Sequence, residues 1–193
     1  MLSEAQLKEE EQDVFFGVIN RFIGYFSLKA QGRSTNDTSR EYPFVAMDTR
    51  QVYDQLDFVK NYLQISYDGY RPSFVDVGCG IGNILIFAEQ FLFDVYGIEK
   101  DEYTVRIAED LIGKNRIEAA DITVYPDYAR FDVIYYFCPL PDHDPQKKLE
   151  QYIEDEMKIG AILIANRKKS TAIDNDPRFK RLSGVLPIWE KVT

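Results

Sequence analysis

The first thirty residues alternate polar and apolar positions with the period of a helix. Apolar residues recur at three- and four-residue spacing, which gathers them along one stripe: Phe15, Val18, Ile19, Phe22, Ile23 and Phe26. We therefore expect a helix from Leu2 to about Ala30. The stripe can pack against the rest of the chain or equally form a dimer face. The polar stretch from Gln31 to Glu41 has no period and predicts a loop.

A second helix is predicted to begin at Asp48. Asp48 is a good N-cap, and Gln51 three residues later completes a capping-box pattern. The buried face is expected at Val52, Leu56, Val59 and either Leu63 or Tyr62. The helix should end near Ser66, because Asp68-Gly69 and Pro72 follow.

From Pro72 onward, short apolar runs alternate with helical segments. The expected strands are Ser73–Val77, Asp94–Ile98, Ile117–Ala120, Phe131–Phe137 and Ala161–Ala165, and the expected helices are Gly82–Phe91, Tyr103–Leu111 and Leu149–Met157. This alternation predicts an α/β fold: an open, mostly parallel, doubly wound sheet with helices on both faces. The segment 178–192 has room for a hairpin. We expect an N-terminal helical extension and loop over residues 1–71 and an α/β domain over 72–193.

Composition and charge narrow the class of protein. The chain has 193 residues, 45% hydrophobic and 28% charged, which suits one globular domain with a small extension. Its net charge of −9 argues against broad contact with nucleic-acid phosphates. The acidic start does not look like a secretory signal, and no apolar run approaches the length of a membrane span. Cys79 and Cys138 fit two buried thiols in a reducing compartment, so we expect a cytoplasmic protein.

Three glycines follow the first predicted strand at alternating positions, Gly78, Gly80 and Gly82. They allow a tight turn and close approach of a ligand, and the helix after them offers free N–H groups. Such a turn suits a nucleotide phosphate or an amino-acid carboxylate. Two details favour the carboxylate. Asn83 stands where a dinucleotide-binding motif needs its last glycine, and Asp76 could accept a hydrogen bond from a ligand's ammonium group.

Two further acids follow the next two strands. Glu99 ends the second strand, 21 residues after Gly78, where a carboxylate can reach both hydroxyls of a ribose. Asp121 follows the third strand, where it could bind the amino group of an adenine while Ile122 packs against the ring. The ordered set of acids and glycines therefore predicts a site for an adenosyl amino acid.

These residues resemble a known family. F-V-D-V-G-C-G-I-G-N, residues 74–83, is similar to the first motif of class I S-adenosylmethionine-dependent methyltransferases, and V-Y-G-I-E-K, residues 95–100, resembles their second. The likeness covers about half the chain, from Phe74 to Ala165. It implies a Rossmann-like sheet of about seven strands, whose antiparallel last strand could come from 187–192. It also implies S-adenosyl-L-methionine as cofactor and S-adenosyl-L-homocysteine as product.

The resemblance assigns roles to individual positions. Asp76 neighbours the methionine end of the cofactor, the glycines line it, Glu99 holds the ribose and Asp121 reads the adenine. The expected cofactor-binding set in this region is Asp76, Gly78, Cys79, Gly80, Gly82, Asn83, Glu99, Lys100, Asp121, Ile122 and Phe137. Upstream, residues 42–47 resemble a segment that lies over the cofactor in some members, so Phe44 or Met47 either touches the ligand or packs in the core. Ala46, Met47 and Asp48 depart from the expected Pro-Thr-Pro.

The loop after the fourth strand, residues 137–144, should face the reacting methyl group. In methyltransferases that act on amide or base nitrogens this position resembles Asn/Asp-Pro-Pro-Tyr. Cys138 and Leu140 depart from that pattern, so nitrogen methylation is not implied. His143 is either a general base or an exposed loop residue. Arg167-Lys168-Lys169 is interpreted as a solvated turn after a strand, and no metal site is expected.

The leading interpretation is a methyltransferase that acts on an unidentified acceptor. The acidic charge favours a protein or small-molecule acceptor over a nucleic acid, and oligomers are compatible with the sequence. One alternative is a cofactor-binding scaffold without turnover, because Cys138-Pro139 is unusual. The other is a nicotinamide-linked oxidoreductase, against which Asp76 and the missing last glycine count.

Overall fold

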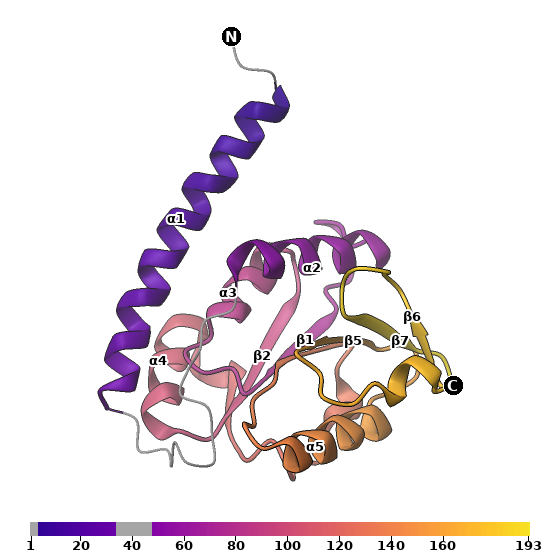
Figure 1. Cartoon of the computed structure of the whole chain (residues 1–193). Helices are drawn as coiled ribbons and strands as arrows, with labels where there is room; N and C mark the ends of the chain where they lie inside the picture. Colours follow the sequence, from indigo (N-terminus) through magenta and orange to yellow (C-terminus); the bar gives the residue numbers. More distant parts are fainter. Residues whose placement is uncertain (1–3, 34–47) are drawn as a thin grey trace.

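The structure, a computed structural model, describes residues 4–33 and 48–193 (Figure 1). Its centre is one seven-stranded sheet in the order β3-β2-β1-β4-β5-β7-β6. The strands are β1 (Ser73–Val77), β2 (Asp94–Glu99), β3 (Ile117–Ala119), β4 (Val133–Phe137), β5 (Ile162–Asn166), β6 (Phe179–Arg181) and β7 (Ile188–Lys191). The predicted strands are confirmed to within two residues at each end, because most of their residues are buried and apolar.

The pairing pattern is mostly parallel. β1 pairs in parallel with β2 and β4, and β3 and β5 extend the parallel sheet on the two sides. β7 runs antiparallel to both β5 and β6, which confirms the expected hairpin and the antiparallel strand from 187–192. The strand order reverses between β1 and β4, and ligands in open α/β sheets bind outside the carboxyl ends of strands at such a point.

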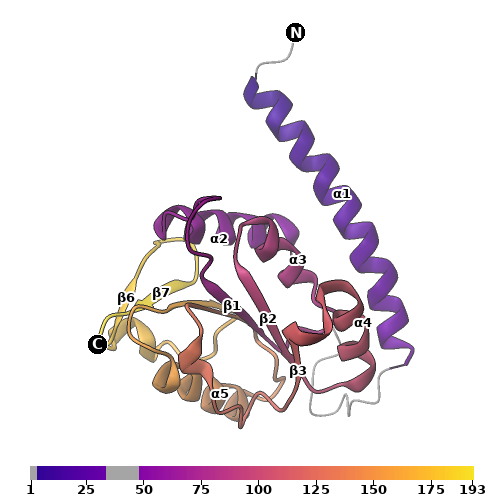
Figure 2. The same cartoon turned by 180° about the vertical axis from the view of Figure 1, so that it is seen from behind.

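Helices cover both faces of the sheet (Figures 1 and 2). One face is covered by α2 (Thr49–Tyr62), α3 (Asn83–Gln90) and α4 (Glu102–Ile112), and the other by α5 (His143–Glu156). Successive strand residues alternate between the two cores: Phe74 of β1 packs with α2 and α3, whereas Val75 and Val77 pack with α5. The predicted doubly wound architecture is confirmed.

The first helix, α1 (Glu4–Gln31), agrees with its predicted range, and its N-terminal part projects beyond the rest of the chain (Figure 2). Its buried side chains are Phe16, Ile23 and Ala30. The expected stripe is therefore partly wrong, since Val18 is exposed and Phe16 was not included in it. The six expected residues cover a broader arc of the helix than the narrow side that faces α2 and α4.

The cap of α2 is confirmed, because the Asp48 carboxylate accepts hydrogen bonds from the N–H groups of Arg50 (2.9 Å) and Gln51 (3.1 Å). The Gln51 side chain instead donates to Asn166 at 3.5 Å. The helix ends at Tyr62 and not near Ser66, because Gln64 turns left-handed (φ 54°) and the N–H of Ile65 bonds back to the carbonyl of Lys60 (3.0 Å). Leu63 packs partly against the core, whereas Tyr62 is exposed.

α5 begins six residues before the predicted start at Leu149. Its first turns contain Pro145 and only polar or charged residues up to Lys148, so they show no apolar period. Proline is tolerated in the first turn of a helix, where its missing N–H removes no intrahelical hydrogen bond. Over residues 4–33 and 48–193, no helix combines the length and apolar character needed to cross a bilayer.

Candidate functional site

The turn after β1 is built by the three glycines. Gly78, Gly80 and Gly82 have φ values of 78°, 52° and 81°, a region that glycine adopts without steric cost. The turn is held against β2, because the N–H groups of Gly78 (2.9 Å) and Cys79 (3.0 Å) both donate to the carbonyl of Ile98. Gly82 is the N-cap of α3, so the free N–H groups of that helix begin at the turn.

Two close approaches surround this turn. A Cβ at Gly78 would lie 3.1 Å from the Cβ of Pro139, so the loop after β4 packs directly on the turn. A Cβ at Gly97 would lie 2.6 Å from the sulfur of Cys79, so the buried thiol fills space that only a glycine in β2 leaves. Both cysteines are buried and free, as predicted. Gly97 was not among the predicted site residues, although a lone glycine within a strand often marks a close approach.

Glu99 lies at the end of β2 and reaches the glycine turn. One carboxylate oxygen accepts from the N–H of Gly80 at 3.0 Å. The other accepts from the N–H groups of Lys100 (2.8 Å) and Asp101 (2.9 Å). The structure therefore brings the predicted glycine turn and the predicted ribose-binding acid into direct contact.

Asp76 is a buried carboxyl group near the end of β1. Burial raises the pKa of Asp76 well above its usual value, and the charge of Glu99 raises it further. Burial also raises the pKa of Glu99, against the opposing effect of its three backbone N–H donors. Two neighbouring acids with raised pKa values would both ionise more readily beside a positively charged group.

Asp121 lies two residues beyond β3, whose last residue, Ala119, pairs with Glu99. It is exposed, and its carboxylate accepts from the N–H (2.8 Å) and the hydroxyl (2.7 Å) of Thr123. Partial burial acts to raise the pKa of Asp121, but these hydrogen bonds and the charge of Lys100 outweigh it and lower the pKa. Ile122 is half-buried against the α5 core.

The loop after β4 begins with a strained residue. Cys138 has a φ of 36°, which is uncommon for a residue other than glycine and is typical of functional or tightly constrained segments. Phe137 before it is half-buried, with the guanidinium of Arg167 5.0 Å from its ring centre. The N–H of Leu140 donates to the side-chain carbonyl of Gln146 at 3.0 Å, so α5 fixes the loop.

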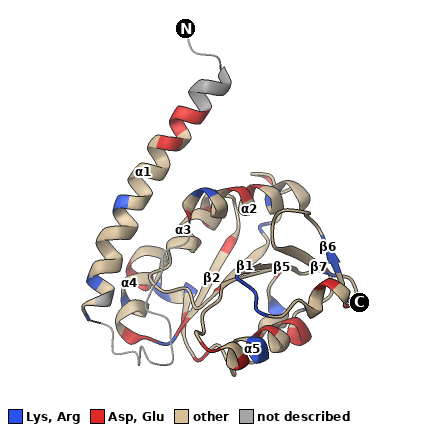
Figure 3. Cartoon of the chain, viewed as in Figure 1, with Lys and Arg blue, Asp and Glu red and all other residues tan. Residues whose placement is uncertain are grey.

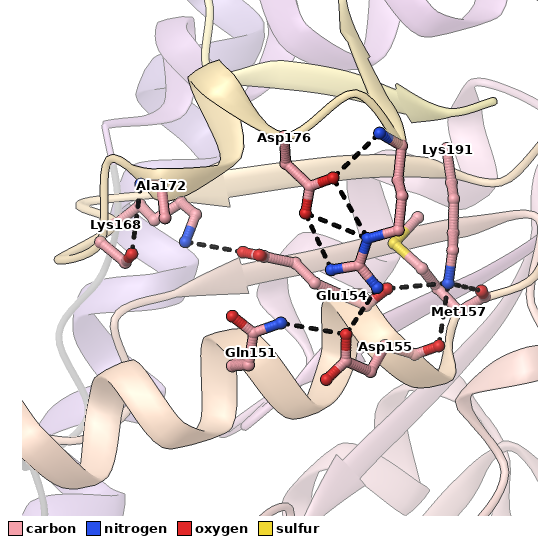
Figure 4. A network of polar contacts seen from close by, with 10 residues as sticks. Gln151, Glu154, Asp155, Met157, Lys168, Ala172, Asp176 and Lys191 are labelled. Carbon is pink, nitrogen blue, oxygen red and sulfur yellow. Dashed lines mark hydrogen bonds and ion pairs between the residues drawn. The ribbon is translucent and has the colours of Figure 1, made fainter. Parts of the chain in front are cut away.

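Of the basic cluster after β5, only Arg167 is exposed, so the predicted solvated turn is wrong for Lys168 and Lys169. Lys168 is nearly buried and forms ion pairs with Glu150 (3.0 Å) and Glu154 (2.7 Å) of α5; the contact with Glu154 is drawn in Figure 4. Glu150 also accepts from the N–H groups of Lys169 and Ser170, both at 2.8 Å. The prediction was wrong because two acids on the buried face of α5 draw this segment inward. The sequence signal for the burial of these acids was their position directly after Leu149 and Ile153, which lie on the buried face of the helix.

A second buried polar network links α2 to the strand ends. The amide of Gln55 donates to Asn166 (2.7 Å), and the amide of Asn166 donates back (3.3 Å). Asn166 ends β5 and also bonds to the hydroxyl of Tyr135, which pairs with Asp76 across β4 and β1. This network was not predicted, although Asn166 directly follows the apolar run of β5 in the sequence.

Three remaining candidates are placed as follows. His143 is the first residue of α5, is exposed, and lies 3.9 Å from the carboxylate of Asp144. Phe44 and Met47 lie outside the described residues. Within the described ranges, no three His, Cys, Asp or Glu side chains gather in a way that could hold a metal ion.

Comparison with known proteins adds the family. Residues 75–165 match the model of a family described as a methyltransferase domain. No curated protein matches the chain. Similar solved structures include an S-adenosylmethionine-dependent methyltransferase from Clostridium acetobutylicum (18% identity, 62% of this chain and 50% of that one, TM-score 0.49). A second is the plantazolicin methyltransferase BpumL with S-adenosylhomocysteine (21% identity, 60% of this chain and 46% of that one, TM-score 0.48). A third is the amino pentose methyltransferase CalS10 from Micromonospora echinaspora with S-adenosylmethionine (17% identity, 63% of this chain and 57% of that one, TM-score 0.48).

The matched part of this chain spans about half the length of these structures. With identities this low and TM-scores below 0.5 they carry no part of the assignment, which depends on the family model and on the strand order itself. The family match covers most of β1, all of β2 to β4 and most of β5, together with the glycine turn and Glu99. Residues 75–165 are therefore a methyltransferase domain, within a sheet of the class I, Rossmann-like type.

Proposed function

We propose that the chain is an S-adenosylmethionine-dependent methyltransferase whose cofactor binds at the carboxyl ends of β1, β2 and β3. The observation that carries the proposal is the acid pair Asp76 and Glu99 beside the glycine turn. S-adenosylmethionine carries a sulfonium and an ammonium group, and positive charge favours the ionised form of both acids. The pyrophosphate of a dinucleotide would place negative charge beside them, which is unfavourable.

The proposed roles follow from position. Asp76 would accept from the ammonium group, and Glu99 would exchange part of its backbone hydrogen bonding for the ribose hydroxyls. Asp121 and Ile122 would bind the adenine. The remaining proposed contacts are Gly78, Cys79, Gly80, Gly82, Asn83, Lys100 and Phe137, with Phe44 and Met47 as further candidates. The bound cofactor supplies an activated methyl group with a neutral thioether as leaving group.

The chain's own contribution to methyl transfer is mainly positioning. In-line alignment of an acceptor with an activated methyl group can supply a large part of the rate enhancement without a base. The strained Cys138 and the packing of Pro139 on Gly78 hold the loop after β4 against the proposed cofactor turn. His143 remains a candidate base for an acceptor that extends to the start of α5.

The acceptor is proposed to be a protein or a small molecule, since a net charge of −9 disfavours a polyanion. A cytoplasmic location is proposed from the two free, buried cysteines.

Parallel calorimetric titrations with S-adenosylmethionine, S-adenosylhomocysteine and NAD test the cofactor. We expect saturable binding of both adenosyl ligands and none of NAD. Binding of NAD alone would favour an oxidoreductase. Incubation with S-adenosylmethionine and a pool of candidate proteins and metabolites then tests turnover. Release of S-adenosylhomocysteine above background supports an enzyme, whereas cofactor binding without release supports a scaffold.

A further inference from the structure

α1 has two apolar faces on opposite sides of the helix. One carries Phe16, Ile23 and Ala30, which are buried against the rest of the chain. The other carries Val14 (68% exposed), Val18 (62%), Tyr25 (64%) and Leu28 (74%). With Arg21, these residues are spaced by four, three, four and three positions, which is the spacing of a helix–helix seam.

Two glycines lie along the edge of this second face. Gly17 and Gly24 are exposed, and a Cβ built on either would meet nothing within 4 Å in the part of the chain that the structure describes. A glycine inside a helix costs roughly 0.5–1 kcal/mol relative to alanine. No described contact within the chain requires either glycine. Both would allow the backbone of another helix to come close to α1.

The charges of α1 are separated along its length (Figure 3). Exposed acids occupy the N-terminal half, at Glu9, Glu10, Glu11 and Asp13, of which Asp13 pairs with Arg50 (2.6 Å). Exposed bases follow at Arg21 and Lys29, and Arg33 lies just beyond the end of the helix. A second α1 in parallel would place like charges together. A second α1 in the antiparallel direction places acids beside bases. It also points the two helix dipoles in opposite directions, which brings their oppositely charged ends together.

We propose that the exposed face of α1 pairs with the same face of a second copy of this chain, in antiparallel orientation. Centring the pair on Arg21 puts Val14 opposite Leu28 of the second copy, and Val18 opposite Gly24 and next to Tyr25 of the second copy. The same centring brings Glu11 to within two positions, about 3 Å along the helix axis, of Lys29 of the second copy. The two Arg21 side chains meet at the axis, where Gly17 and Gly24 leave room for them to diverge. At 1.5 Å per residue, the stretch from Val14 to Leu28 gives an apolar seam of about 21 Å.

The oligomeric state of the full chain tests the pairing. Sedimentation equilibrium over micromolar concentrations should show a dimer, and Val18→Glu or Tyr25→Glu should raise the dimer dissociation constant about tenfold or more. Both side chains are exposed in the single chain, so folding should be preserved, which circular dichroism checks. Val185→Glu is the matched control, since Val185 is 88% exposed between β6 and β7. A monomer throughout, or a dimer that neither variant weakens, overturns the proposal.

Cysteine cross-linking tests the orientation. Arg21→Cys should form a disulfide with its own copy, and Val14→Cys should cross-link only when mixed with Leu28→Cys. Cys79 and Cys138 are buried and should not compete. Self-cross-linking of Val14→Cys alone would establish a parallel pair and overturn the proposal. Glu11→Lys should weaken the dimer, and Lys29→Glu in the same chain should restore it; failure of the restoration contradicts the antiparallel orientation.

Discussion

Glu99 is one side chain that accepts from three backbone N–H groups, at Gly80, Lys100 and Asp101. It therefore links the glycine turn to the segment after β2 before any ligand arrives. Glu99→Gln keeps the size of the side chain but removes its charge. We expect S-adenosylmethionine to bind about 1.5–3 kcal/mol more weakly to this variant, the range for hydrogen bonds to charged groups.

Titration calorimetry measures this change in affinity, and thermal unfolding checks that the variant folds. Glu102→Gln is the control, because Glu102 is an exposed acid three residues later in the first turn of α4. Unchanged affinity in folded Glu99→Gln would remove Glu99 from the proposed site.

The raised pKa of Asp76 predicts a coupling between cofactor binding and protons. Burial holds part of the population protonated above the usual carboxyl range, and a cationic ligand favours the ionised form. Affinity for S-adenosylmethionine should therefore rise with pH above the usual carboxyl range, with protons released on binding. Folding stability of the free protein should change with pH in the opposite direction to ligand affinity. A carboxyl group whose pKa is raised in the folded state stabilises the fold at low pH, and this contribution is lost as the pH rises through the folded-state pKa.

Calorimetry in two buffers of different ionisation enthalpy measures the released protons. Asp76→Asn should reduce the proton release, and Asp54→Asn is a control on the exposed side of α2. Equal proton release by wild type and Asp76→Asn contradicts the coupling.

The residues of the site differ in how clearly the sequence predicted them. Asp76, the glycines and Glu99 follow apolar runs at strand ends, and parallel strands bring such ends together. Gln55, Glu150 and Asn166 lie at positions whose pattern indicates a buried face. The pattern gives no sign that a polar side chain there has a specific hydrogen-bond partner. Apart from Gln146, which bonds to Glu150 within α5, their hydrogen-bond partners are 18 to 115 residues away in sequence, and only the packed structure identifies them.

At the scale of elements, α5 depends on a residue from the other end of the domain. The ammonium group of Lys191 in β7 donates to the carbonyls of Glu154 (2.9 Å), Asp155 (2.8 Å) and Met157 (2.8 Å), as Figure 4 shows. The last carbonyls of a helix have no partners within it, so this lysine satisfies the C-terminal end of α5. The ladder between β5 and β7 places the side chain there.

Lys191→Met should lower the free energy of unfolding by about 1.5–3 kcal/mol, because buried carbonyls lose a charged donor. Lys180→Met on β6 is the control, since Lys180 is exposed. Urea unfolding followed by circular dichroism gives both values. If the two variants unfold at the same urea concentration, Lys191 does not stabilise the end of α5.

Element boundaries follow the strength of the apolar pattern. The strands of the parallel sheet were predicted closely, because burial on both faces makes their runs continuous. The start of α5 and the end of α2 were not, because polar first turns and a left-handed residue at Gln64 leave no periodic signal.

At the scale of the whole molecule, α1 is attached to the rest of the chain through its buried side chains Phe16, Ile23 and Ala30. Ile23→Asp would bury an unpaired charge in the contact between α1 and the rest of the chain, which is strongly unfavourable. We expect α1 to detach, so that its amides exchange hydrogen faster while those of β1 and β4 remain protected. Asn20→Asp, at an exposed position of the same helix outside the face that carries Val14, Val18, Tyr25 and Leu28, should leave this contact intact.

Hydrogen exchange read by mass spectrometry distinguishes these outcomes. Loss of protection in α1 and α2 together, with the sheet still protected, would support the proposed division into an extension over 1–71 and a domain over 72–193, whereas detachment of α1 alone would place α2 with the domain. Loss of protection in the sheet as well would show that the two parts fold as one unit.

The place of β7 between β5 and β6 has a consequence for the order of folding. The edge of β5 is filled only by residues 188–191, which follow β6 in the chain. A folding intermediate that lacks β7 therefore presents an apolar strand edge, which can pair with other chains. Docking of β7 is the step before which we expect chaperone binding to matter most.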